Sequence, residues 1–149
     1  MNRKRTSRFR QCVFVPKNKE KYKGSFPILL RSSWEISIAR VLDHNPNVVS
    51  WGSESVVIPY ENPLTGRISR YFVDFNMTMR DKEGNLKKFL IEIKPHAQTL
   101  PPSQTRNTRS LQRRQAEYIK NQAKWKAATS FANSRNSQFV VLTEKHLKF

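Results

Sequence analysis

Cysteine, acidic residues and long apolar runs are all scarce in this 149-residue chain. A single cysteine excludes an intrachain disulfide framework and a zinc site built on cysteine ligands. No apolar run approaches the ~18 residues that a membrane-spanning helix needs. The apolar stretch 12–15, behind the basic N-terminus, is too short for the hydrophobic region of a signal peptide. From these absences we expect a soluble intracellular protein that has no membrane partner.

Basic residues dominate the charge of the chain. There are 28 Lys and Arg against 11 Asp and Glu, which gives a formal net charge of +17 and a pI near 10.6. This excess predicts a polyanionic partner, with nucleic acid ahead of an anionic membrane surface. Aromatic residues make up 11% of the chain, more than a disordered polybasic tail contains. Length and aromatic content together predict one folded domain.

The first 23 residues carry nine Lys or Arg and a single acid. We interpret 1–23 as an extended basic arm and 24–149 as one domain. A solvated tail would have a similar composition, but a long block almost free of acids favours phosphate contact. The candidate DNA-binding residues of this arm are Arg3, Lys4, Arg5, Arg8 and Arg10.

The rest of the sequence predicts an α/β (α+β) domain with a mixed central sheet and the element order α-β-β-β-β-α-β. A helix is expected over 32–46, capped by Ser32 or Ser33. Strands are expected over 48–51, 55–60, 70–79 and 86–94, followed by a helix over 110–129 and a strand over 138–143.

The second predicted helix is basic on much of its surface. Its apolar residues Ala116, Ile119, Ala123 and Ala127 are expected to face the sheet. Its basic side chains could simply be solvated, but the overall charge of the chain favours contact with DNA. The candidate DNA-binding residues on this helix are Arg109, Arg113, Arg114, Lys120 and Lys124.

The two longer strands are predicted to form a hairpin in one register. Gly84 stands where a three-residue hairpin loop needs a left-handed residue. This loop would place Phe75 opposite Ile91, and Met77 opposite Phe89. A slip of one residue would move polar side chains onto the apolar face, so turn chemistry and hydrophobic pattern select the same register.

That register brings two carboxylates together. Asp74 falls directly opposite Glu92, with Cβ atoms about 4.5–5.5 Å apart. Like charges in this position destabilise a hairpin, and apolar neighbours sharpen the repulsion. A divalent cation between the carboxylates would compensate. Lys94, on the same face, is the alternative partner, in a surface pair neutralised by Lys94 and solvent. We favour the metal site, because the chain has only 11 acids and two of them meet across a hairpin rich in Phe and Ile.

The run Val73-Asp74 followed by Glu92-Ile93-Lys94 resembles the signature of the PD-(D/E)xK restriction-endonuclease-like nucleases. The closer resemblance is to the phage head completion nucleases, which are related to the A-subunit endonucleases of transposases. It extends over about residues 26–143. The motifs that carry it include Arg31-Ser32-Ser33-Trp34-Glu35, Tyr71-Phe72-Val73-Asp74-Phe75 and Leu90-Ile91-Glu92-Ile93-Lys94-Pro95, with Gln98-Thr99. The family has Pro where this chain has Val73, a position that supplies no ligand.

The resemblance implies a metal site. Asp74 and Glu92 would bind Mg²⁺ through side-chain oxygens, with Mn²⁺ as a possible substitute. Ile93 would add its backbone carbonyl. Glu35, from the first helix, would complete the acidic cluster directly or through water, although an acid in the first turn of a helix also complements the helix dipole.

The same resemblance assigns roles to two further residues. Lys94 would position or activate the attacking water, and Gln98 would support the site just beyond the strand. A lysine is suited to the first role because its point charge stabilises the charge that develops on phosphorus.

The function implied is a Mg²⁺-dependent DNA nuclease with little sequence specificity, an endonuclease and in addition an exonuclease. The resemblance further implies a role in processing packaged double-stranded DNA before heads join tails. The expected location is the host cytoplasm during assembly and then the virion, beside head or neck proteins. Two alternatives belong to other classes: a non-catalytic basic nucleic-acid-binding protein, and a structural neck protein with a vestigial nuclease fold.

Overall fold

The structure is a computed structural model that describes residues 11–103 and 106–147. A four-stranded mixed sheet lies at its centre, in the order β3-β6-β7-β8. Its strands are β3 (Val48–Ser53), β6 (Phe75–Arg80), β7 (Leu86–Ile93) and β8 (Ser137–Leu142). β7 and β8 are parallel and the other neighbours are antiparallel. The predicted mixed sheet flanked by helices is therefore confirmed.

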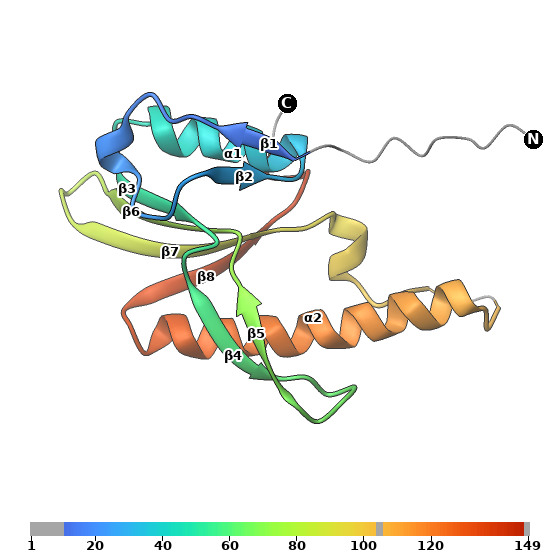
Figure 1. The fold of residues 1–149 in the computed structure, drawn as a ribbon. Coiled ribbons are helices and arrows are strands. Elements are labelled where there is room, and N and C mark those ends of the chain that lie inside the picture. Colours follow the sequence, from blue (N-terminus) through green and yellow to red (C-terminus); the bar gives the residue numbers. More distant parts are fainter. Residues whose placement is uncertain (1–10, 104–105, 148–149) are drawn as a thin grey trace, which may run out of the picture.

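One layer covers each face of this sheet (Figure 1). Helix α1 (Ser33–His44) and the small β1 (Cys12–Phe14)–β2 (Ile28–Leu30) sheet lie on one side. Helix α2 (Arg109–Asn133) and the β4 (Val57–Glu61)–β5 (Ile68–Phe72) hairpin lie on the other. Two 3₁₀ turns complete the fold, η1 (Lys19–Lys21) and η2 (His96–Thr99).

Each face of the sheet has its own apolar core. Trp51, fully buried, and Phe75 centre the core beneath α1. Tyr71, Val73 and Leu90 belong to the second core, beneath α2. Of the residues expected to face the sheet from α2, Ala123 and Ala127 pack against this second core, whereas Ile119 is 45% exposed and that expectation is wrong.

The predicted register of the β6–β7 hairpin is confirmed. Phe75 pairs with Ile91, and Met77 pairs with Phe89. Gly84 has φ +83°, the left-handed conformation that the turn requires. A single glycine and an alternating apolar pattern thus place the two strands correctly against each other.

The expected strand over 70–79 is broken in two, which corrects the prediction. β5 ends at Phe72, β6 begins at Phe75, and Asp74 lies at a bend between them. Simple alternation would put Val73 on the face of Phe75, yet Val73 packs in the other core. The chain therefore crosses from one face of the sheet to the other at the residue pair Val73-Asp74.

The arm boundary predicted at residue 23 is also wrong. Pairing of β1 with β2 and burial of Tyr22 place 12–22 in the domain. The buried carboxylate of Asp43 fastens this segment to α1, accepting bonds from the backbone N–H groups of Lys17 (2.9 Å) and Asn18 (3.1 Å). The expectation failed because it was based on the charge of the segment, and charge does not reveal which of its apolar residues pair and pack against the domain. Residues 1–10, with the five basic candidates of the arm, lie outside the described residues.

Neither α1 nor α2 combines the length and the apolar character that a membrane span requires, within the two described stretches of the chain.

Candidate active site

A β-bulge sets the position of Asp74. Ser53 pairs with Phe75, and Val57 pairs with Phe72. The three residues 54–56 therefore lie opposite only two residues, 73 and 74. Glu54 absorbs the extra length with φ +49°, and its N–H donates to the backbone carbonyl of Asp74 at 3.1 Å. Bulges redirect a strand and re-aim its side chains. The backbone, and not the carboxylate, therefore holds this bend.

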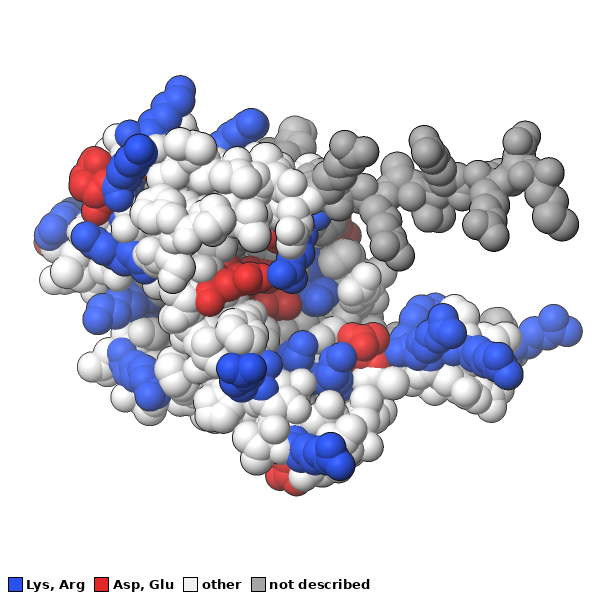
Figure 2. Space-filling view, viewed as in Figure 1, with Lys and Arg blue, Asp and Glu red and all other residues white. Residues whose placement is uncertain are grey.

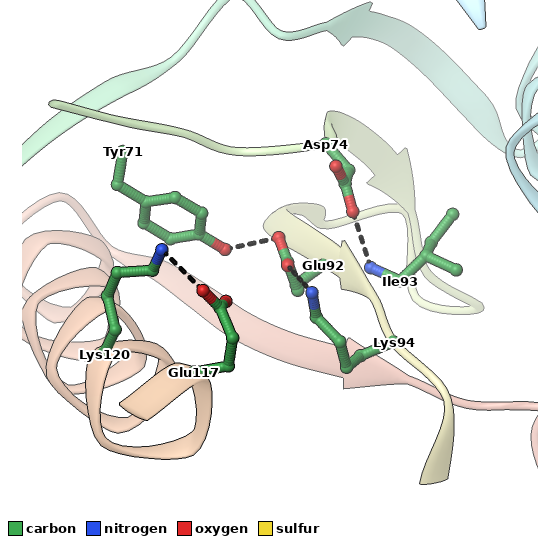
Figure 3. A network of polar contacts seen from close by, with 7 residues as sticks. All are labelled: Tyr71, Asp74, Glu92, Ile93, Lys94, Glu117 and Lys120. Carbon is green, nitrogen blue, oxygen red and sulfur yellow. Dashed lines mark hydrogen bonds and ion pairs between the residues drawn. The ribbon is translucent and has the colours of Figure 1, made fainter. Parts of the chain in front are cut away.

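Asp74 lies just beyond the last paired residues of the hairpin, next to Glu92. Its Oδ2 accepts a hydrogen bond of 2.8 Å from the backbone N–H of Ile93 (Figure 3). Because Phe75 pairs with Ile91, the register brings Asp74 to the level of Glu92, as the sequence predicted. The bend then turns its carboxylate toward the end of β7.

Glu92 is 7% exposed and has a partner on each oxygen. The hydroxyl of Tyr71 donates to its Oε2 at 2.5 Å, and Lys94 Nζ lies 3.6 Å from its Oε1 (Figure 3). Lys94 is thus the neighbour that the sequence offered as an alternative to a cation. The role of Tyr71 was missed, because strict alternation puts Tyr71 on the opposite face from Asp74.

The pair is electrostatically strained in the absence of a cation. Burial, followed by the charge of Glu92, raises the pKa of Asp74 to about 8, and the more distant Glu35 adds to the rise. The Ile93 N–H and Lys94 act in the opposite direction. Burial and the charge of Glu92 also raise the pKa of Tyr71, which keeps its hydroxyl protonated as a donor.

This donor set fits a magnesium ion. Mg²⁺ prefers carboxylate oxygens, takes one or two of them, and keeps several waters. Asp74 and Glu92 supply two such groups, and a cation would relieve the repulsion that raises the pKa of Asp74. Ile93, the predicted carbonyl ligand, lies beside them through its N–H bond to Asp74.

Glu35 is not gathered into a carboxylate cluster. Its Oε2 accepts a bond of 2.9 Å from the backbone N–H of Arg31, and its own N–H donates to the N-cap Ser32 at 3.1 Å. Within 11–103 and 106–147, no three His, Cys, Asp or Glu side chains lie close enough to hold one ion. Glu35 thus bonds the start of α1, where the sequence also allowed it to complement the helix dipole, and a direct cluster of three carboxylates is not found among the described residues.

Gln98 is also separate from the pair. It lies on η2, exposed, and lines a different pocket between η2 and α2. Pro95 and the 3₁₀ turn carry the chain away from β7, and the Gln98 side chain makes no hydrogen bond to Asp74, Glu92 or Lys94, all of which the structure describes.

An open cleft of about 430 Å³ leads to the carboxylates. Three of its lining residues are cationic, and Lys124 Nζ lies 5.4 Å from the ring centre of Tyr71. Burial, and then the neighbouring Lys120, lower the pKa of Lys124. The cleft is lined by Arg31, Glu54, Arg70, Tyr71, Phe72, Asp74, Glu92 and Lys124. Of the cations, only Lys124 was predicted as a DNA-binding residue; Arg31 stood in a motif of the family resemblance without an assigned role, and Arg70 had no sequence signal other than its charge.

Basic side chains gather around this site (Figure 2). An acidic patch lies in a hollow of this face with Lys and Arg on its margins, and further blue side chains follow the N-terminal half of α2. All five predicted basic residues of α2 lie on the helix, and Lys120 pairs with Glu117 at 3.0 Å. Arg109, Arg113 and Arg114 are exposed. The site is therefore acidic at its base and basic around it.

The arrangement defines a class of protein. An Asp at a strand bend, a Glu-x-Lys motif on the adjacent strand and a mixed sheet between two helices form a restriction-endonuclease-like fold and site. The family model described as TnsA-like endonuclease N terminal matches residues 45–144, and the chain belongs to this family. The match includes Asp74, Glu92 and Lys94 and leaves Glu35 outside.

A curated relative agrees with this assignment. The chain is 41% identical over 141 residues to the head completion nuclease of Enterobacteria phage T4, covering 91% of each chain. No solved structure matches the chain. The nuclease class suggested by the sequence is thereby confirmed.

Proposed function

We propose that this protein is a Mg²⁺-dependent DNA endonuclease that hydrolyses phosphodiester bonds with little sequence specificity. The observation that carries the proposal is the pair of the half-buried Asp74 and the buried Glu92 beside Lys94, at the base of a cleft lined by cations. A non-catalytic nucleic-acid-binding protein would gain nothing from two acids in contact with DNA, because they repel phosphates.

Several residues of the chain have separate roles in the proposed hydrolysis. When bound, a divalent cation supplies Lewis-acid stabilisation of the phosphate charge in the transition state. Lys94 places its ammonium group beside the reacting phosphate and orients the attacking water. Tyr71 fixes the orientation of Glu92. The cations Arg31, Arg70 and Lys124 neutralise the phosphates of the strand that enters the cleft.

The biological role follows the relative. Its printed name is a head completion nuclease, and the similarity covers 91% of both chains. We therefore assign to this chain the processing of packaged double-stranded DNA, with exonuclease action at the ends it creates. In this role it would bind head or neck proteins, in the host cytoplasm during assembly and later in the virion. Mn²⁺, with similar ligand preferences, would replace Mg²⁺.

A plasmid assay tests the proposal. Purified protein should nick and linearise supercoiled DNA with Mg²⁺ and leave it intact with EDTA. Glu92→Gln and Lys94→Met should each lower the rate by at least about 100-fold, whereas Glu83→Gln and Lys88→Met make the same changes on the exposed hairpin and should not. Cleavage in EDTA, or full activity of Glu92→Gln, would contradict the assignment.

A further inference from the structure

A second pocket lies beside the cleft, between η2 and α2, with a volume of about 300 Å³. One wall comes from the segment that follows Lys94, so it is covalently continuous with the catalytic strand. The other wall is α2, which also carries Lys124 into the active cleft. Glu117, which lines the pocket, is seven residues from Lys124, or about 10 Å along the helix axis. A nucleic-acid strand in the cleft would therefore pass close to this pocket.

Asn121 marks the pocket as more than a packing gap. This residue is 5% exposed and lines the pocket, and its side-chain amide makes no hydrogen bond to another described residue. Its amide atoms are not among the enclosed polar atoms that lack a partner, so the amide is open to the pocket and free to bond a ligand with donors and acceptors of its own. An asparagine amide offers both a donor and an acceptor.

The remaining walls suit a flat, partly apolar group attached to an anion. Leu100, Pro102 and the ring of Tyr118 supply apolar surface. Arg113 and Arg114, both exposed, supply positive charge on the same pocket. An amide edge, an aromatic ring and flanking cations are the groups that proteins use to hold an unstacked nucleobase and its phosphate.

We infer that this pocket binds the base of an unpaired nucleotide next to the phosphate that is cut. A base inside a duplex is stacked on both faces and cannot enter an enclosed pocket without being extruded. The pocket would thus direct the enzyme to nicks, flaps, overhangs and branches, where an unpaired base is available at low cost. The inference rests on the proposed function for its biological meaning, and on the pocket alone for binding.

The test separates base binding from phosphate binding. Fluorescence anisotropy in EDTA, where no cut occurs, compares two nicked duplexes that each carry one unpaired nucleotide. One has adenine at that position and the other an abasic residue with the same phosphate. The wild-type protein should bind the adenine duplex at least about fivefold more tightly, because stacking of one base contributes about 1–3 kcal/mol. Equal affinities for the two duplexes would overturn the inference.

Variants of the pocket residues test whether the preference for the adenine duplex arises in this pocket. Asn121→Leu removes the amide at similar volume, and the adenine-to-abasic affinity ratio should fall to about 1. Tyr118→Leu, at a less buried position, removes the ring and should lower the ratio independently if Asn121→Leu does not fold. Gln122→Leu makes a comparable change on the exposed side of the same helix and should keep the wild-type ratio. A wild-type ratio in folded Asn121→Leu or Tyr118→Leu would also overturn the inference.

The outcomes distinguish this site from the nuclease proposal. A protein that prefers the adenine duplex but never cuts plasmid would keep the pocket and lose the catalytic assignment. A protein that cuts plasmid and binds both duplexes equally would keep the catalytic assignment and lose the base pocket, leaving it for a peptide or another ligand.

Discussion

The hydroxyl of Tyr71, on β5, donates a hydrogen bond of 2.5 Å to Oε2 of Glu92, on β7. This contact exists because the chain bends at Asp74, which lets Tyr71 and Asp74 approach the same glutamate from different directions. Glu92 is thereby held between a neutral donor and the cation Lys94, with both oxygens oriented. Tyr71 is a positioning residue, since it acts on substrate through Glu92.

Replacing Tyr71 with Phe tests this role. The loss of a hydrogen bond to a charged group should destabilise the fold by about 1.5–3 kcal/mol. Plasmid cleavage should slow by about tenfold in kcat with little change in DNA affinity, because Glu92 loses its orientation. Tyr60→Phe is the matched control: Tyr60 is buried in the same core, and its hydroxyl bonds no other described residue. Equal rates for the two variants would show that the hydrogen bond is purely structural.

The raised pKa of Asp74 predicts how stability depends on pH without metal. Its pKa is about 8 in the folded protein and 3.8 as an isolated group, so the folded state binds more protons between these values. Stability is then fully present below about pH 4 and declines as the pH rises toward about 8. Asp74→Asn cannot ionise, so in EDTA at about pH 8 it should be more stable than wild type by at least about 1 kcal/mol.

Urea unfolding across this pH range provides the measurement. The advantage of Asp74→Asn should shrink steadily as the pH falls toward 4, where the wild-type carboxyl is protonated. Asp81→Asn, the same change at the hairpin turn, should leave the pH profile unaltered, because Asp81 is distant from the pair in the register. A constant difference between wild type and Asp74→Asn at every pH would show that Asp74 ionises normally.

Divalent metal should offset the loss of folding stability that ionised Asp74 causes. Mg²⁺ that binds only the folded state stabilises it by about 2.7 kcal/mol at a hundredfold excess over Kd, or about 5–10 °C in Tm for a chain of this size. Wild type should show this shift, and Asp74→Asn and Glu92→Gln should lose most of it. Thermal melts with Mg²⁺ and with EDTA measure the effect, and an undiminished shift in both variants would remove these residues as ligands.

The sequence predicted the hairpin that builds the site because its constraints are local. Gly84 and the alternation of apolar residues fixed the register, and the register placed Asp74 beside Glu92. The bend that re-aims Asp74 could not be predicted in this way. It depends on Glu54, which follows β3 in a left-handed conformation and bonds the backbone of Asp74, a contact that no periodicity in 70–79 reveals.

The N-terminal segment shows where prediction from the sequence fails, because its constraints are not local. Its composition is that of a basic tail, yet Asp43 binds its backbone and Tyr22 enters the core beside Trp51, with ring centres 4.8 Å apart. These anchors lie more than 20 residues away in sequence, so charge statistics alone could not identify them. Glu35 is a related case: its place in the first turn of a helix allowed both dipole complementation and a metal ligand, and its hydrogen bonds to the helix start appear only in the structure.

DNA affinity is the last property that the charge distribution predicts. Because β1 begins at Cys12, replacements within the first ten residues leave every described residue in place in the sequence, whereas removing 1–23 would take away β1 and Tyr22. Replacement of the five basic residues there by Gln should weaken duplex binding and make the slope of log K against log salt shallower. Each lost phosphate contact changes that slope by about 0.9. The variant concerned carries Gln at Arg3, Lys4, Arg5, Arg8 and Arg10.

Anisotropy titrations of a labelled duplex in EDTA, at several salt concentrations, measure this slope. The control replaces Lys82, Lys87 and Lys88 by Gln, near the turn of the β6–β7 hairpin; none of these three residues lines the active cleft. The slope for that variant should stay close to the wild-type slope, because a duplex lying across the cleft and α2 does not need to contact the hairpin turn. Should the N-terminal variant keep the full wild-type slope, its charges contact no phosphate and serve to dock the protein onto a partner. The exposed arginines of α2 would then be the main duplex contacts, and their replacement by Gln would have to account for the missing slope.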